Sequence, residues 1–206
     1  MIVPTGFYPG IQMRADCIHL FQNTQIIQPK TYETAMKYFY GVLFSILFLP
    51  AYSFAADSFE TKIVGKSGEE IGSLKISQGT QGVVVNIKAS NLPAGYHGMH
   101  FHAVADCDHA GGFKSAKGHV DPDKKPHGFL NEEGPHEGNL PNLIVAEDGT
   151  VEVELYSSLV SLKDGKANLL DADGSSLIIH ANPDDHNSQP IGGSGGRIAC
   201  AVIAKQ

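Results

Sequence analysis

The feature that most restricts the fold of this chain is a series of short runs in which apolar and polar residues alternate. Period-two alternation over four to eight residues is typical of a half-buried β-strand. Turn residues such as Gly, Pro, Asn and Asp separate the runs, and no long stretch has helical periodicity. The predicted strands span residues 59–64, 71–77, 82–89, 99–103, 150–156, 176–181 and 197–204. The sequence therefore predicts an all-β domain, either a sandwich or a barrel.

Two segments lack this alternation and are expected to be long loops. Residues 107–143 are rich in Gly, Pro and His, and residues 182–196 are rich in Gly and Asp. Structureless loops of this length in a compact domain usually carry function.

The region around residue 40 has the layout of a secretory signal. Met36 and Lys37 precede an apolar run over residues 38–49, and Ser53 and Ala55 are the small residues expected before a cleavage site. The alternative is a transmembrane helix, but the run is shorter than the roughly 20 apolar residues that a span needs. We expect residues 36–55 to be a signal peptide cut after Ala55.

The domain boundaries follow from that signal. Because a signal peptide begins near the initiator methionine, we expect residues 1–35 to be an over-extended start or an unstructured extension. Residues 56–206 then form one domain without a membrane span. The formal net charge of −7 excludes a nucleic-acid partner, since no basic stripe is present to neutralise phosphates.

Histidines are crowded into the second half of the chain. His100 and His102 lie two apart on one predicted strand, so both imidazoles project to the same face. His180 ends another strand and, taken alone, reads as a core histidine with satisfied hydrogen bonds. Three more histidines lie in the first long loop at spacings of eight and nine: His119, His127 and His136. Six imidazoles exceed the needs of one tetrahedral ion, so we predict two adjacent copper or zinc ions that share one bridging histidine.

Two motifs around these histidines resemble the signatures of copper/zinc superoxide dismutases. The segment GMHFH over residues 98–102 resembles the first signature, and GGSGGRIACAVI over residues 192–203 resembles the second. Between them, GHVDP over residues 118–122 and the later histidines follow the family order. The resemblance covers residues 57–206, and the short segment after Cys107 resembles the bacterial periplasmic branch. It implies an eight-stranded Greek-key barrel or sandwich with two functional loops, in an antioxidant enzyme of the periplasm or of secretions.

The resemblance also implies the site residues. The implied copper ligands are His100, His102, His119 and His180. The implied zinc ligands are His119, which bridges the ions, His127, His136 and Asn139. Asp184 matches the carboxylate that links a copper ligand to a zinc ligand, Arg197 matches the cation beside copper, and Cys107 and Cys200 match the intrasubunit disulfide. His97 is expected to pack rather than ligate, and His109 and His186 match no ligand position.

The implied reaction is the dismutation of superoxide to dioxygen and hydrogen peroxide. Arg197 attracts and orients the anion, and His119 supplies one proton. Asn139 departs from the family pattern, which has an aspartate there, so we expect zinc to bind more weakly; Glu133 and Glu137 are the candidate replacements.

Three other functional interpretations and the oligomeric state stay open. A copper-only dismutase is favoured by Asn139 and disfavoured by the retained His127 and His136. A non-catalytic copper or zinc carrier is disfavoured by Arg197, because a metal store needs no anion guide. A zinc hydrolase lacks a general base near the ligands. The chain is either a monomer or a homodimer.

Overall fold

The computed structural model describes residues 57–205. The predicted signal peptide and residues 1–35 lie outside the described residues, so both remain predictions. Within the described part of the chain, the regular structure is β-strand apart from one short 3-10 turn, η1 (Lys114–Ala116). The prediction of an all-β domain is confirmed.

All seven predicted strands are present, with ends within one residue of the expected positions. The strands are β1 (Ser58–Gly65), β2 (Glu70–Gln78), β3 (Val83–Ala89), β4 (Gly95–His97), β5 (Met99–His102), β6 (Leu143–Val145), β7 (Val151–Ser157), β8 (Ser175–His180) and β9 (Arg197–Ile203). Only β4 and β6, of three residues each, were not predicted. They pair with each other in a small sheet.

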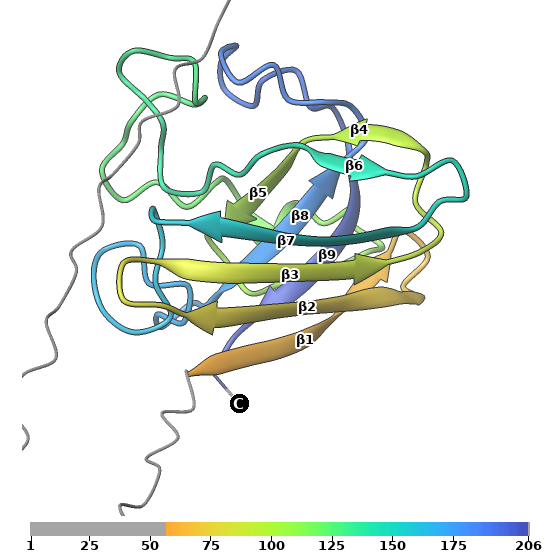
Figure 1. Ribbon diagram of the computed structural model, residues 1–206, viewed down its shortest axis with the longest axis horizontal. Coiled ribbons are helices and arrows are strands. Elements are labelled where there is room, and N and C mark those ends of the chain that lie inside the picture. Colours follow the sequence, from red (N-terminus) through yellow and green to blue (C-terminus); the bar gives the residue numbers. More distant parts are fainter. Residues whose placement is uncertain (1–56, 206) are drawn as a thin grey trace, which may run out of the picture. The chain divides into compact units, whose positions relative to one another are not determined.

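The strand order agrees with the predicted eight-stranded barrel. The large sheet has the order β5-β8-β9-β1-β2-β3-β7, and all its pairs are antiparallel. Only Gly98 separates β4 from β5, so the two are one strand that passes from the small sheet to the large one. Counted in that way, the order has eight strands, with β6 and β7 at opposite ends. A short turn joins β6 to β7, closed by a 2.9 Å hydrogen bond from the Ala146 amide to the Thr150 carbonyl. The sheet must therefore curl until its ends meet, as Figure 1 shows.

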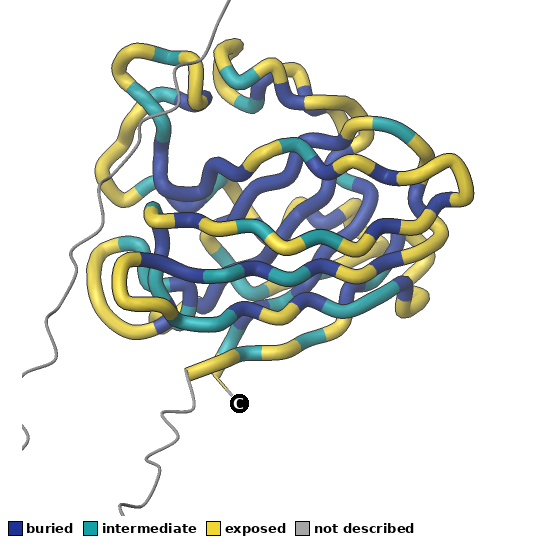
Figure 2. The backbone as a smooth tube through the Cα atoms, viewed as in Figure 1, coloured by how far each residue is buried: buried dark blue, intermediate teal, exposed yellow. Residues whose placement is uncertain are grey.

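The inner faces of the curled sheet form the main core. On β3 the alternation predicted from sequence holds, with Val83, Val85 and Ile87 buried inside. On β2 the spacing between buried residues lengthens from two to three between Leu74 and Ile71. The register of β2 against β1 shifts there in a β-bulge. Figure 2 shows the buried residues lining the interior of the sheet.

Strand β8 is buried on both faces, unlike the strands at the front of Figure 1. Its inner residues Leu177 and Ile179 join the main core. Its outer residue Ile178 packs in a second cluster with Phe113, Ala116 and Cys200. The chain between β5 and η1 thus covers the outside of the sheet.

The later part of the first long loop, residues 118–142, and the second long loop lie at one end of the barrel and are bonded to each other (Figure 1). The Gln189 amide donates to the His127 carbonyl at 2.8 Å, and the Leu130 amide donates to the His186 carbonyl at 2.9 Å. Asn142 also donates to the Asp184 carbonyl at 2.8 Å. Each loop therefore fixes the position of the other.

None of the helical structure in residues 57–205 is long and apolar enough to cross a membrane.

Candidate metal centre

Strands β5 and β8 place three histidines on the outer face of the sheet. His100 lies opposite Ile178 in the β5–β8 pairing, and Ile178 belongs to the outer cluster. Because strand side chains alternate, His102 and His180 project to the same side as His100. His119 reaches this group because residue 119 forms a β-bridge with His102. The structure thus brings together the four histidines that the family resemblance assigned to copper.

One nitrogen of each of these four rings is buried and has no hydrogen-bond partner. The atoms are Nδ1 of His100 and Nε2 of His102, His119 and His180. The four histidines offer ligand atoms within 4.8 Å of one another. Orphaned buried nitrogens are costly in a protein unless a ligand satisfies them.

In three of these rings, those of His100, His102 and His180, the second nitrogen explains why the orphaned one is free to bind. His102 Nδ1 donates to the Lys117 carbonyl at 2.9 Å, and His180 Nδ1 donates to the Gly195 carbonyl at 3.2 Å. His100 Nε2 donates to Asp184 Oδ2 at 2.7 Å. Each partner is an acceptor, so the proton is on the outer nitrogen and the lone pair points inward. Such rings are ready metal ligands without any rearrangement of protons.

A second group is formed by His119, His127 and His136. His136 Nε2 lies 2.8 Å from His119 Nδ1 and 3.2 Å from His127 Nδ1. Ligands about 2.0–2.1 Å from a tetrahedral zinc ion are separated by roughly 3.3–3.4 Å, so the 3.2 Å distance fits zinc and the 2.8 Å distance is shorter than zinc requires. His119 alone belongs to both groups, with Nε2 in the first and Nδ1 in the second. Its two nitrogens suit the bridge predicted from sequence.

Asp184 joins the two groups from behind. Its carboxylate is buried and accepts hydrogen bonds from His100 Nε2 at 2.7 Å and from His127 Nε2 at 3.0 Å. The backbone amide of His186 adds a third bond at 2.7 Å. Burial raises the pKa of this carboxyl, but the hydrogen bonds from His100 and His127 outweigh burial, so the pKa lies well below its usual range. A permanent carboxylate here fixes the tautomer of one ring in each group.

Five of the clustered imidazoles are held neutral by a lowered pKa: those of His100, His102, His119, His136 and His180. Burial is the largest cause in every case, and it lowers the pKa of His136 and of His180 to about 4. It lowers the pKa of His100, His102 and His119 as well. Protons therefore do not compete for these nitrogens near pH 7, which favours metal binding.

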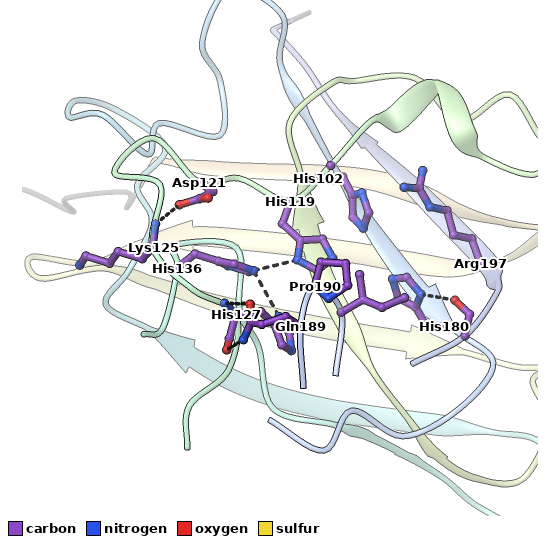
Figure 3. Close-up of a pocket in the computed structure, with 13 residues that line it drawn as sticks. His102, His119, Asp121, Lys125, His127, His136, His180, Gln189, Pro190 and Arg197 are labelled. Carbon is purple, nitrogen blue, oxygen red and sulfur yellow. Dashed lines mark hydrogen bonds between the residues drawn. The ribbon is translucent and has the colours of Figure 1, made fainter. Parts of the chain in front are cut away.

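A pocket of about 430 Å³ opens onto both groups. Figure 3 shows His102, His180 and Arg197 at one end of it and His127 and His136 at the other. The pocket gives a small molecule from solvent access to the histidines.

The guanidinium of Arg197 is anchored at the pocket wall. It donates to the carbonyls of Phe113 and Lys117. Both residues have positive φ, 60° and 62°, a backbone conformation that non-glycine residues seldom adopt. The Lys117 carbonyl also accepts from His102, so one backbone group positions the cation and a member of the first group. The sequence carried no signal for this, because any residue type offers a carbonyl.

The remaining histidines stand outside the groups. Both nitrogens of His97 lie 2.8 Å from backbone carbonyls, of His180 and Pro93, which leaves none for a metal. His109 is exposed beside Gly68, and His186 packs near Phe129. Asn139 is fully buried beside His127, but the second group contains no carboxylate.

We expect Asp184→Asn to weaken metal binding at both groups by about 10–100-fold, because outer carboxylates orient ligand imidazoles and raise their basicity. Competition with a chromophoric chelator measures the affinity. Asp185→Asn is the matched control, since Asp185 is exposed and bonds to Ser188 rather than to a histidine. Equal affinities in the two variants would contradict this role for Asp184.

Comparison with known proteins gives consistent matches. Residues 70–203 match the family model for copper/zinc superoxide dismutase (SODC). Superoxide dismutase [Cu-Zn] 1 of Aquifex aeolicus is 46% identical over 143 residues, which cover 68% of this chain and 84% of that protein. The structure of a SOD-like protein from Bacillus subtilis has a TM-score of 0.67 at 38% identity and covers 70% of this chain and 97% of that chain. The structure of Cu/Zn superoxide dismutase from Brucella abortus has a TM-score of 0.58 at 29% identity and covers 71% and 99%.

Proposed function

The chain belongs to the copper/zinc superoxide dismutase family, and we propose that its first histidine group holds the copper at which superoxide is dismuted. The observation that carries this proposal is the set of four buried, unpartnered imidazole nitrogens, three of which belong to residues that line one pocket with Arg197. The donor set fits the ion, because imidazole nitrogen serves both oxidation states of copper.

Copper held by His100, His102, His119 and His180 would supply reversible one-electron transfer, the chemistry by which one superoxide is oxidised to dioxygen and a second is reduced to hydrogen peroxide. The second half of the reaction also consumes two protons. The protein must therefore bring an anion to the pocket and deliver protons there.

Arg197 is the residue placed to bind the anion. Its guanidinium is fixed by the two carbonyls and lines the same pocket as His102 and His180. A fixed cation in a cleft raises the local concentration of a small anion and speeds its association.

His119 is the residue placed to deliver a proton. Its Nε2 faces the first group and its Nδ1 faces the second, so when Nδ1 is engaged as a ligand the neutral ring carries its proton on Nε2. That proton and one from solvent balance the conversion of superoxide to hydrogen peroxide.

The second group is proposed to hold zinc through His119, His127 and His136. Its three converging nitrogens fit the ion, and holding His119 by Nδ1 orients Nε2 toward the first group. A second candidate function is a dismutase that works with copper alone. Asn139 supports it, because the side chain beside His127 is an amide and not a carboxylate.

The test of the function is to purify the mature protein made from the full chain, load it with copper and zinc, and measure bound metals and superoxide consumption together. Fast consumption with one copper per chain is expected. Bound copper without superoxide consumption would show that the protein is a metal carrier and not a dismutase. Equal consumption with copper alone would identify the copper-only enzyme.

Arg197→Gln should slow superoxide consumption roughly tenfold or more at low salt and flatten its dependence on ionic strength, because the guiding charge is lost. Rates measured by pulse radiolysis at several salt concentrations give both quantities. Arg197→Lys keeps the charge without the planar fork and should retain most of the salt dependence. Unchanged rates in the Arg197→Gln enzyme would show that the guanidinium has no role in the reaction.

The proposed compartment is the bacterial periplasm or the cell exterior. The predicted signal over residues 36–55 supports it, as does the disulfide between Cys107 and Cys200, since disulfides persist in oxidising compartments. Cell fractionation and the N-terminal sequence of the mature protein test this, with cleavage after Ala55 expected. A mature protein retained in the cytoplasm would contradict it.

Sedimentation distinguishes the monomer from the homodimer.

A further inference from the structure

Asn139 lies against the second histidine group with its side chain fully buried. Its Oδ1 lies 3.3 Å from the amide nitrogen of Gly128, and its Nδ2 lies 3.3 Å from Nδ1 of His127. The amide therefore has one end toward the backbone and the other toward a nitrogen that the group needs for its metal.

The backbone amide of Gly128 determines which end of the Asn139 side chain is the oxygen and which is the nitrogen. A backbone N–H can only donate, so the oxygen of Asn139 must face it. Gly128 has a φ of +108°, and a Cβ there would lie 2.1 Å from the His186 carbonyl oxygen, so the loop is held closely at this point. The NH₂ of Asn139 therefore faces His127 Nδ1. An amide NH₂ is a donor without a lone pair for a metal.

No carboxylate replaces Asn139 within the described part of the chain. The metal-ligating group consists of three imidazoles, and Asp184 lies on the outer nitrogen of His127. Glu137, one candidate from sequence, lines a different pocket and lies 3.9 Å from the amine of Lys125. Glu133, the other candidate, is exposed and belongs to no ligand group.

Solvent has a path to this group. The rings of His119, His127 and His136 all line the 430 Å³ pocket that also serves Arg197 (Figure 3). Structural zinc sites are closed by four protein ligands, whereas sites with three protein ligands keep a position for water or another small ligand.

We propose that the second metal is held by three imidazoles alone and takes its remaining ligand, water or a small anion, from the pocket. This makes it an exchangeable, anion-binding metal rather than a closed structural one. The proposal rests on the proposed function in one respect, namely that the second group holds zinc. It adds a second position in the pocket where small anions bind, apart from Arg197.

The test uses the copper(I) protein with Co²⁺ at the second group, where the visible spectrum of cobalt reports its ligands and copper(I) is colourless. Wild type is compared with Asn139→Asp, in which one oxygen keeps the Gly128 bond and the other replaces the amide nitrogen. We expect azide to change the cobalt spectrum of wild type but not that of N139D. We also expect N139D to bind Zn²⁺ at least roughly tenfold more tightly in chelator competition, because it gains an anionic ligand.

Asn187→Asp is the control for charge alone, since Asn187 is exposed in the second loop. It should behave as wild type does. An azide-insensitive spectrum in wild type, or equal Zn²⁺ affinities of wild type and N139D, would show that the Asn139 oxygen completes a closed site and would overturn the inference. Failure of wild type to take up Co²⁺ or Zn²⁺ would overturn it too. Superoxide consumption, measured separately, decides the proposed function whatever the cobalt spectrum shows.

Discussion

Replacing both Cys107 and Cys200 by serine should lower the free energy of unfolding by about 4–5 kcal/mol. The two cysteines form a disulfide with a Cα–Cα distance of 5.7 Å and a sequence separation of 93. In the chain-entropy model, a cross-link that closes a loop of this length lowers the entropy of the unfolded state and so raises its free energy by about that amount. Denaturant unfolding of the metal-free protein measures the difference directly.

Replacing both cysteines by serine should also affect the position of Arg197 in the pocket. The disulfide packs beside Phe113, Ala116 and Ile178 and ties the loop that carries η1 to strand β9. The carbonyl of Phe113, within this cluster, accepts from the guanidinium of Arg197. A loosened loop therefore gives the cation more freedom, and superoxide consumption should fall with metal content unchanged.

Chemical reduction of the wild-type disulfide is the control, because it opens the same loop without changing the sequence. The reduced protein and the double serine variant should agree in stability. A loss below about 1 kcal/mol in both would show that the unfolded chain gains little freedom, against the entropic account.

Most of the fold could be predicted because its strands are long enough to show period-two alternation. On β3 the alternate residues are buried, and on β7 they are buried or partly buried, as the sequence indicated. The three-residue strands β4 and β6 were missed because so short a segment has no period, and only the pairing of Tyr96 with Ile144 and its neighbours defines them. The bulge at Ile71 was likewise invisible, since it depends on the register against β1.

The gathering of the histidines could be predicted from residue types and spacing, and the structure brings those residues together. The orientation of the rings could not be predicted. It depends on backbone carbonyls of Lys117 and Gly195, which any residue offers. The sequence showed that Asn139 is not a carboxylate, but only the position of the Gly128 amide shows which end of its side chain faces His127.

The metal-free protein should lose stability as the pH falls from about 6.5 to about 4. Burial lowers the pKa of His180 to about 4, whereas a histidine in the unfolded chain has a pKa of about 6.5. Between these values the unfolded state binds a proton that the native state does not, so the free energy of unfolding decreases as pH decreases. His180 alone contributes roughly 3 kcal/mol to this loss, and His136, whose pKa is also lowered to about 4, acts in the same direction. Below about pH 4 these two histidines are protonated in both states and add no further loss.

Metal binding should shift this loss to lower pH. Copper or zinc occupies the same nitrogens that protons would take, so protons must displace the metal before the native state is weakened. Urea unfolding of the metal-free and metal-loaded protein at pH 7, 5.5 and 4.5 gives the two profiles. In the metal-free protein, His180→Gln should reduce the slope between pH 6.5 and 4 because one titrating group is removed. The slope is the relevant quantity, since the substitution also changes packing. A metal-free protein whose stability is flat over this range would show that the histidines exchange protons freely when no metal is bound, and the clustered rings would then not be held neutral by burial.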